Sequence, residues 1–402
     1  MTSATATAAD LRPACALCGH RAHELASHVM EAHGMTVAEY NARFPSAPTV
    51  SEAVILRMDD FKASKGRRPA PALTDLVVPM AGIDVPVWAS VEESAVLPLP
   101  PAYAWPTKGA LRKDVHEAVI SVLSGRHTYI WGMPGTGKDA FVHGISHLAR
   151  RPAMILSIVP GRDIGPWFYT RSVSTTGTGW EYGAGWRAVT EGYIGPDGVR
   201  RPYIVLITDL DRADEAQVEW LRLLMDGISG RIIGPDGRTV PVLKGTTFVA
   251  TANTAGGGDE RGRMVSARPM DASILDRFQR RFQFHYMDWA DEEPIVRTKF
   301  PSLVAKCPEV FAQIGNCTAA IRDAVAKETL YAEFSHRGVC AVLGHAEDII
   351  TVTGKCPDGL LKRAFRAWID GLSDENTRLE AKRLIDPHLK GGSLDDIYSD
   401  DT

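Results

Sequence analysis

The sequence lacks any run of eighteen apolar residues, so we expect no membrane-spanning helix. It also lacks a basic segment followed by an apolar run at its start, so no secretory signal is evident. Neither sign of charge dominates, and a formal charge of −4 gives no reason to expect a surface that coats nucleic acid. Six cysteines, four of them scattered, suit a reducing cytoplasm with ordinary buried thiols, although this usage leaves a disulfide open. We therefore expect a cytoplasmic protein.

The composition is that of a soluble globular protein, with 45% hydrophobic and 23% charged residues. A chain of 402 residues has room for two or three domains and for a sizeable core.

A glycine-rich segment dominates the middle of the chain: Gly132-Met133-Pro134-Gly135-Thr136-Gly137-Lys138-Asp139. An apolar, strand-like stretch (127–131) precedes it, and a helical pattern (140–148) follows it. In such a loop the backbone N–H groups converge at a helix N-terminus and hold phosphate. Lys138 then reaches the outer phosphates of a nucleoside triphosphate. The usual pattern ends in Ser or Thr, and Asp139 replaces it here.

Three further apolar runs, at 154–159, 203–207 and 247–252, predict buried parallel strands, and residues 282–286 predict a closing strand. Ligands of open α/β sheets bind at the carboxyl ends of such strands. The polar residues Thr208, Asp209 and Asn253 follow or end these runs and should therefore lie at one edge. This pattern predicts an α/β fold with a parallel sheet.

Two segments between these strands favour local structure outside the sheet. Residues 161–198 carry many aromatic side chains among glycines, which indicates either a local core or an inserted hairpin that presents aromatics to a partner. Residues 231–240 centre on a Gly-Pro-Asp-Gly turn and predict a hairpin.

The N-terminal region has the residue types of a zinc site. Two thiolates on a turn and two imidazoles on the next helix can close a tetrahedron around Zn²⁺, and the ligands would be Cys15, Cys18, His28 and His33. His20 and His23 are alternative ligands. A helix from Glu24 would cover the site with Leu25, Val29 and Ala32. As a whole, residues 15–44 resemble the Ros/MucR-type zinc finger, although the spacer is short.

A finger that reads DNA needs basic side chains at the start of its helix, and residues 23–27 here are His-Glu-Leu-Ala-Ser. A short basic run follows later, at Lys62, Lys65, Arg67 and Arg68, where a solvated linker is the simpler interpretation. We therefore favour a finger that docks on protein, with DNA binding as the alternative.

Taken together, the phosphate loop, the acidic strand end, the Asn-tipped strand 248–254 and Leu275-Asp276-Arg277-Phe278 resemble AAA+ ATPases of the MoxR kind. The nearest match is the AAA+ subunit of aerobic cobaltochelatase. The similarity covers roughly residues 80–345, and it includes Gly82-Ile83-Asp84 and Phe334-Ser335-His336-Arg337. It implies a P-loop AAA+ domain with a helical lid and a hexameric ring that hydrolyses ATP. It also implies a remodelled partner protein, such as a von Willebrand-type or chelatase subunit.

The resemblance also implies roles for single residues. Lys138 and the loop amides would hold the triphosphate, and Asn253 would orient the attacking water. Arg277 would be the arginine finger that acts on the neighbouring subunit's nucleotide, with Arg280 or Arg281 as alternatives. Arg337 would couple the phosphate state of the bound nucleotide to the position of the helical lid.

The Mg²⁺ ligands depart from the family pattern of four apolar residues followed by Asp-Glu. Here four apolar residues, 204–207, precede Thr208-Asp209. The hydroxyl and the carboxylate have then exchanged places: Asp139 and Thr208 would serve Mg²⁺, and Asp209 would replace the catalytic Glu. In the rival register Asp209 is the metal ligand and Leu210 stands at the Glu position, which predicts a poor hydrolase.

These patterns divide the chain as follows: a disordered tail (1–13), a zinc-finger-like domain (14–60), a linker and extended arm (61–104), the AAA+ α/β domain (105–286), the lid (287–390) and an acidic tail (391–402). The leading hypothesis is an ATPase that remodels a partner protein. The alternatives are a DNA-associated ATPase targeted by the finger, and a nucleotide-dependent scaffold with little hydrolysis.

Overall fold

The computed structural model describes residues 13–21, 25–49, 73–174, 177–226, 230–235, 237–258 and 267–391. The chain divides into two compact units, Met1–Ala70 and Pro71–Thr402. The basic run at Lys62–Arg68, the alternative ligand His23 and nearly all of the two expected tails lie outside the described residues. Within the described residues, no helix is long and apolar enough to cross a membrane.

The first unit contains helices α1 (Ala26–His33) and α2 (Val37–Arg43). A left-handed Gly34 ends α1, and a capping box between Thr36 and Glu39 starts α2. Its buried hydrophobic residues are Cys15, Leu25, Val29 and Tyr40. Leu25 and Val29 are buried as predicted, but Ala32 is exposed, because α1 turns its other side toward the small core.

The second unit is built on a five-stranded parallel sheet in the order β13-β3-β12-β9-β4. The loop-bearing strand β3 therefore lies between the last two strands of the sheet, which is the order of a P-loop AAA+ domain and confirms the predicted fold class. The strands are β3 (Thr128–Trp131), β4 (Ala153–Ser157), β9 (Ile204–Thr208), β12 (Thr247–Ala252) and β13 (Arg280–Gln283).

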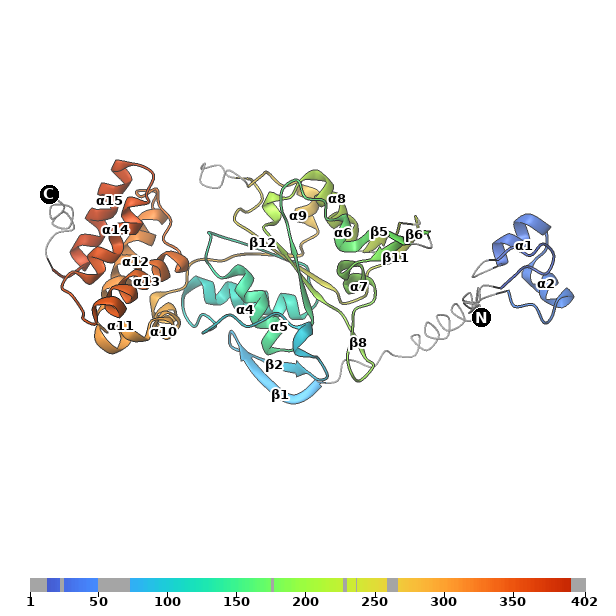
Figure 1. The fold of residues 1–402 in the computed structure, drawn as a ribbon, viewed down its shortest axis with the longest axis horizontal. Helices are drawn as coiled ribbons and strands as arrows, with labels where there is room; N and C mark the ends of the chain where they lie inside the picture. Colours follow the sequence, from blue (N-terminus) through green and yellow to red (C-terminus); the bar gives the residue numbers. More distant parts are fainter. Residues whose placement is uncertain are drawn as a thin grey trace, which may run out of the picture. The chain divides into compact units, whose positions relative to one another are not determined.

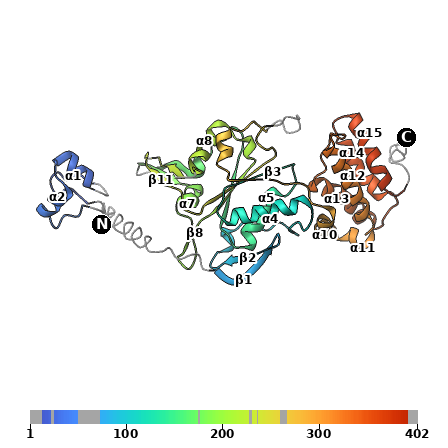
Figure 2. The same ribbon diagram turned by 180° about the vertical axis from the view of Figure 1, so that it is seen from behind.

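Helices cover both faces of this sheet, which explains why its strands are apolar without alternation. Along β9, Ile204 and Leu206 pack on one face, and Val205 and Ile207 pack on the other. In Figures 1 and 2, α4 and α5 lie together on one side of the sheet, and α8 and α9 lie on the other. The covering helices are α4 (Gly109–Leu123), α5 (Lys138–Leu148), α6 (Gly165–Phe168), α7 (Ala184–Thr190), α8 (Glu215–Leu224) and α9 (Ala272–Asp276), with 3-10 turns η1 (Glu93–Ala95) and η2 (Leu210–Arg212).

The closing strand is shifted from the predicted position. We expected residues 282–286, and β13 instead spans Arg280–Gln283. Arg280 and Arg281 pair with Thr128 and Tyr129 of β3. Since β13 is an edge strand with exposed arginine side chains, the apolar pattern alone did not reveal its start.

Among the described residues, four antiparallel hairpins lie outside the five-stranded sheet. They are β1 (Leu73–Met80) with β2 (Ile83–Trp88), β5 (Tyr169–Ser174) with β6 (Gly177–Tyr182), β7 (Tyr193–Ile194) with β8 (Arg200–Arg201), and β10 (Arg231–Ile233) with β11 (Thr239–Pro241). The hairpin predicted at 231–240 is confirmed. Part of the expected arm is paired as β1–β2. The aromatic segment forms both a local core and a hairpin, because Phe168 and Trp186 are buried while Trp180 on β6 is 46% exposed. That the hairpin presents aromatics to a partner stays a prediction.

The lid is a bundle with one continuous core, which lies at the orange-to-red end of the chain in Figure 2. Its helices are α10 (Trp289–Lys299), α11 (Pro301–Lys306), α12 (Val310–Ala326), α13 (His336–Thr353), α14 (Leu360–Asp370) and α15 (Glu375–Ile385), followed by the turn η3 (Asp386–His388). A disulfide joins Cys307 to Cys356, so these two are not the free thiols expected from the cysteine usage.

Candidate functional site

The glycine-rich loop fits tightly between β13 and the lid. It runs from the end of β3 to the start of α5 at Lys138. Gly132, Gly135 and Gly137 have positive φ values of 152°, 75° and 84°, which side chains rarely allow. A Cβ at Gly132 would lie 2.1 Å from the Phe284 carbonyl oxygen, and one at Gly135 would lie 2.7 Å from the Cβ of Ser335. Gly132 and Gly135 are therefore required by close approach as well as by conformation, and Gly137 by conformation alone.

The ammonium group of Lys138 lies at the centre of the loop. Its Nζ donates to the carbonyl oxygens of Gly132 (2.7 Å) and Met133 (3.1 Å) and to Oδ1 of Asn253 (3.2 Å). Burial lowers the pKa of Lys138 to about 8, although the nearby Asp139, Asp211 and Asp209 oppose this shift. The structure thus brings together the predicted phosphate lysine and the predicted sensor, which are 115 residues apart.

The two predicted acidic residues differ in their contacts. Asp139, in the first turn of α5, accepts a hydrogen bond from the Thr251 hydroxyl at 2.7 Å. Asp209 follows β9 in a left-handed conformation and forms an ion pair with Arg212 at 3.7 Å. Burial raises the pKa of Asp209; Arg212 opposes the shift, and Asp139 and Asp211 add to it. Asp139 and Asp209 therefore lie within electrostatic reach of each other.

The oxygen atoms available as metal ligands at this edge suit Mg²⁺. Two carboxylates, Asp139 and Asp209, share the edge with the hydroxyls of Thr208 and Thr251, and hard oxygen ligands are those that Mg²⁺ prefers. Thr208 ends β9 and is paired with Ser157 of β4. Thr251, rather than Thr208, supplies the hydroxyl hydrogen-bonded to Asp139.

Asp211 is a site residue that the sequence reasoning missed. Its side chain is buried, and Oδ2 accepts from the backbone N–H groups of Asn253 (2.9 Å) and Thr254 (3.0 Å) and from the Thr254 hydroxyl (3.3 Å). The carboxylate therefore fixes the end of β12 from which Asn253 reaches Lys138. The signal in the sequence was an Asp two residues beyond Asp209, which is easily taken for a surface turn.

The arginines are placed differently from one another. Arg277 is half-buried and donates to the carbonyl oxygens of Arg222 (3.0 Å) and Ser273 (2.7 Å). Arg280 and Arg281 are exposed, and Arg281 donates to the Leu275 carbonyl oxygen at 2.8 Å. Arg337 is exposed in the first turn of α13, and its charge contributes to lowering the pKa of Lys138. Of these four arginines, only Arg337 is thereby placed near the loop of its own chain.

A cavity of about 200 Å³ opens beside the loop. Apolar and aromatic side chains form most of its wall, and the lid contributes a few charged ones, as is usual for ligand pockets. Tyr286 ties the wall to the loop by donating to the Pro134 carbonyl oxygen at 3.2 Å. The lining includes Tyr103, Trp105, Phe141, Phe284, Tyr286 and Met287, with Glu292, Lys299, Arg322 and His336 from the lid.

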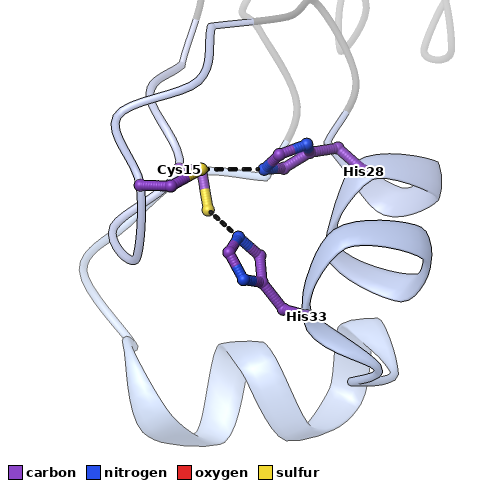
Figure 3. Close-up of side chains that lie close together, drawn as sticks. Cys15, His28 and His33 are labelled. Atoms are coloured by element: carbon purple, nitrogen blue, oxygen red, sulfur yellow. Dashed lines mark hydrogen bonds between the residues drawn. The ribbon is translucent and has the colours of Figure 1, made fainter.

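The predicted zinc ligands converge in the first unit. One ligand atom from each of Cys15, Cys18, His28 and His33 lies within 4.8 Å of all the others. Cys15 Sγ is 3.5 Å from His33 Nε2, and Cys18 Sγ is 3.1 Å from His28 Nε2. Figure 3 shows the rings of His28 and His33 pointing toward Cys15. His20 instead stacks on the His28 ring with centroids 4.2 Å apart. Two thiolates and two imidazoles fit the donor set of a closed zinc site.

Comparison with known proteins yields structural likeness alone. No family model and no curated protein sequence matches the chain. A variant of RuvB from Thermotoga maritima is 13% identical, with 69% of this chain and 77% of that chain covered and a TM-score of 0.44. The T. maritima RuvB Holliday junction branch migration motor is 13% identical over 65% of this chain and 72% of that chain, with a TM-score of 0.40. A putative ATPase from Cytophaga hutchinsonii is 13% identical over 69% of this chain and 90% of that chain, with a TM-score of 0.34. The fold class rests on the strand order and the loop.

Proposed function

We propose that this chain is an AAA+ ATPase that binds Mg·ATP on residues 132–139 and hydrolyses it. One observation carries the proposal: at the carboxyl edge of the sheet, Lys138 contacts Asn253 and lies among three carboxylates, and residues 135–137 of the same loop line an apolar cavity. The loop amides and Lys138 suit the phosphates, and the cavity suits the base. A steady-state ATP turnover assay of the full chain with Mg²⁺ tests it, and a chain that neither binds nor hydrolyses ATP refutes it.

The side chains then have distinct tasks. Lys138 holds the outer phosphates, and Asn253, fixed through Asp211, orients the attacking water. Asp209 accepts a proton from that water, a task suited to a carboxyl whose pKa burial has raised. When bound, Mg²⁺ neutralises charge that develops on the phosphates. Asp139 and Thr208 would hold it, with Thr251 orienting Asp139.

Exchanging the two metal ligands tests this assignment. The double variant Asp139→Thr with Thr208→Asp should retain far more ATPase activity than either single variant, because one carboxylate and one hydroxyl remain. A double variant as inactive as the worse single variant contradicts the exchange. Asp209→Asn separates the two registers: it should abolish turnover while Mg-dependent nucleotide binding remains. Loss of that binding would instead make Asp209 the metal ligand.

We further propose that the active form is a ring, a hexamer, in which Arg277 reaches the neighbouring subunit's nucleotide. In this structure the Arg277 side chain donates hydrogen bonds to two carbonyl oxygens of its own chain, so these bonds have to break on assembly. Arg277→Ala should lower turnover by about 10³–10⁵-fold, the range known for arginine fingers. Mixing Arg277→Ala chains with Lys138→Met chains should restore part of the activity at composite sites. Normal ATP turnover by Arg277→Ala would exclude Arg277 as the arginine finger. The variants Arg280→Ala and Arg281→Ala would then test the two exposed alternatives.

The remodelled partner, in this proposal, is a protein such as a von Willebrand-type or chelatase subunit. The β5–β6 hairpin supports a protein partner because Val173 is 83% exposed and Trp180 is 46% exposed. Exposed apolar side chains on a projecting hairpin are typical of contact surfaces. In the first unit, the described start of α1 at Ala26 carries no basic residue, which favours a protein-docking finger.

A further inference from the structure

The segment at residues 97–108, here called the strap, lies between η1 and α4, and the structure describes all of it. It contains no helix or strand, so its backbone has no hydrogen-bond ladder of its own, and other elements have to hold it. Residues 100–106 of the strap line the cavity beside the phosphate loop. The shape of that cavity therefore depends on what fixes the strap.

The strap begins on α5, the helix that starts at Lys138. The N–H group of Leu97 donates to the Ser146 hydroxyl oxygen at 2.9 Å. The Tyr103 ring packs against Gly144, where a Cβ would lie 2.5 Å from the ring carbon Cζ. The first part of the strap is therefore held by the α/β domain.

The other end of the strap is held by the lid. Asp291, in the first turn of α10, accepts hydrogen bonds through Oδ2 from the N–H groups of Thr107 (2.7 Å) and Lys108 (3.1 Å). Its Oδ1 accepts from the Thr107 hydroxyl. The two strap residues are 184 and 183 positions away from Asp291 in the chain. Hydrogen bonds to an ionised acceptor are stronger than bonds between neutral groups, so this carboxylate is a firm anchor.

The same carboxylate lies at the start of α4. Lys108 is the N-cap residue of α4 and supplies no side-chain cap. The helix dipole favours a negative charge at this end of a helix, and Asp291 supplies it from the lid. Gly109, the first residue of α4, has a φ of 72°, and a Cβ on it would lie 2.8 Å from Asp288 Oδ2. The starts of α4 and α10 therefore pack closely, and Figures 1 and 2 show these helices side by side.

Three elements meet at Asp291, and each of them lines the cavity. The strap contributes residues 100–106, α4 contributes Leu111 and Val115, and α10 contributes Ile295 among others. Ile295 follows Asp291 by four residues, so the two side chains share one face of α10. Asp291 therefore joins the elements of one cavity wall, although it is not a residue of the phosphate loop.

We propose that Asp291 is a positioning residue: it fixes the strap to the lid and thereby preforms the cavity for the base, a role that rests on the proposed nucleotide site. A wall that is ordered before binding loses less conformational freedom when the ligand arrives. ATP, ADP and AMP share the base, so loss of Asp291 weakens the binding of all three by the same factor. Because the contacts of the base do not change during hydrolysis, the KM for ATP rises while kcat stays the same.

The variant Asp291→Ala of the full chain tests this role. Competition against a fluorescent ATP analogue should show ATP, ADP and AMP each binding about tenfold more weakly, with KM raised alike and kcat unchanged. The control is Asp323→Ala, which removes an exposed lid carboxylate paired with Lys327 and should bind as wild type does. Wild-type affinity in Asp291→Ala overturns the proposal, as does a loss confined to ATP or a fall in kcat alone.

Two further variants separate the hydrogen bonds from general stability. Asp291→Asn should stay within about threefold of wild type, because its amide oxygen can accept from both N–H groups and its NH₂ group can donate to the Thr107 oxygen. Thr107→Val should weaken binding about threefold and add no further loss to Asp291→Ala. An Asn variant as weak as the Ala variant overturns the role. If Asp291→Ala does not fold, Thr107→Val decides, and wild-type affinity in it overturns the proposal.

Hydrogen exchange tests the strap without nucleotide. In Asp291→Ala, peptides that contain the amides of Thr107 and Lys108 should exchange at least about tenfold faster than in wild type, and Asp323→Ala should leave them unchanged. Unchanged exchange in Asp291→Ala overturns the proposal. If the wild-type chain binds no nucleotide, the proposed function fails, while the exchange rates still decide whether Asp291 holds the strap.

Discussion

Replacing Lys138 with Met should weaken ATP binding by about a thousandfold and abolish turnover. At about 4 Å and an effective dielectric of about 20, one charge pair contributes about 4 kcal/mol, which is nearly three decades of affinity. Met retains about the length of the side chain and removes its charge together with its N–H donors. Equilibrium titration with a fluorescent ATP analogue measures the change. Lys244→Met, at an exposed lysine, serves as the control and should bind normally. A loss below about tenfold contradicts the role of Lys138.

The same lysine predicts how binding depends on pH. Its pKa of about 8 in the free protein means that the ammonium loses its proton as the pH rises through 8. ATP affinity should then fall by up to about tenfold per pH unit above 8, and Lys138→Met should show no such slope. The free energy of unfolding changes with pH in the opposite direction. Between pH 8 and the ordinary lysine pKa of about 10.5, the unfolded chain binds more protons at this lysine than the folded chain does. Lys138 should therefore make the folded chain more stable as the pH rises in that window.

Removing zinc should unfold the first unit and leave the second intact. Structural zinc contributes about 10–16 kcal/mol in finger peptides. Among its described residues, 13–21 and 25–49, this unit buries only Cys15, Leu25, Val29 and Tyr40 as hydrophobic core. Metal analysis of the full chain should give about one zinc per chain. With a chelator present, limited proteolysis should cleave residues 25–49 and spare the lid and the sheet.

Variants at the cluster sharpen this test. The double variant Cys15→Ser with Cys18→Ser should lose the metal, and zinc retained by it rules the site out. His20→Ala should retain zinc, because His20 only stacks on the His28 ring.

The local parts of the candidate site could be predicted from the sequence. The strand, loop and helix around Lys138 follow from spacing and hydrophobic pattern, and so does the convergence of strand ends at one edge. The convergence of Cys15, Cys18, His28 and His33 followed from residue type and spacing, because their two segments are close in the chain. Ala32 and the start of β13 were predicted wrongly, because which side of a short helix or of an edge strand is buried depends on the neighbours it packs against.

Contacts between distant segments were not predictable from one sequence. Asp139 and Thr251 are 112 residues apart, and Asp211 and Asn253 are 42 apart. Each pair meets only because β9 and β12 end, and α5 begins, at the same edge of the sheet. The contact of Asp291 with Thr107 likewise depends on how α10 packs against the strap, which no local pattern reveals.

A comparison of ATP, ADP and AMP binding tests the central claim most directly. In the proposed function, the loop, Lys138 and Mg²⁺ would act on the β- and γ-phosphates. The cavity would hold the base, which the three nucleotides share. Titration of the full chain in Mg²⁺ should give one site per chain that binds ATP and ADP at least a hundredfold more tightly than AMP. Chelating Mg²⁺ should strongly weaken the binding of ATP, since the Asp139 carboxylate then faces phosphate without a cation between them. Equal affinity for AMP and ATP, or no binding of ATP at millimolar concentration, would contradict a phosphate-binding loop at residues 132–139.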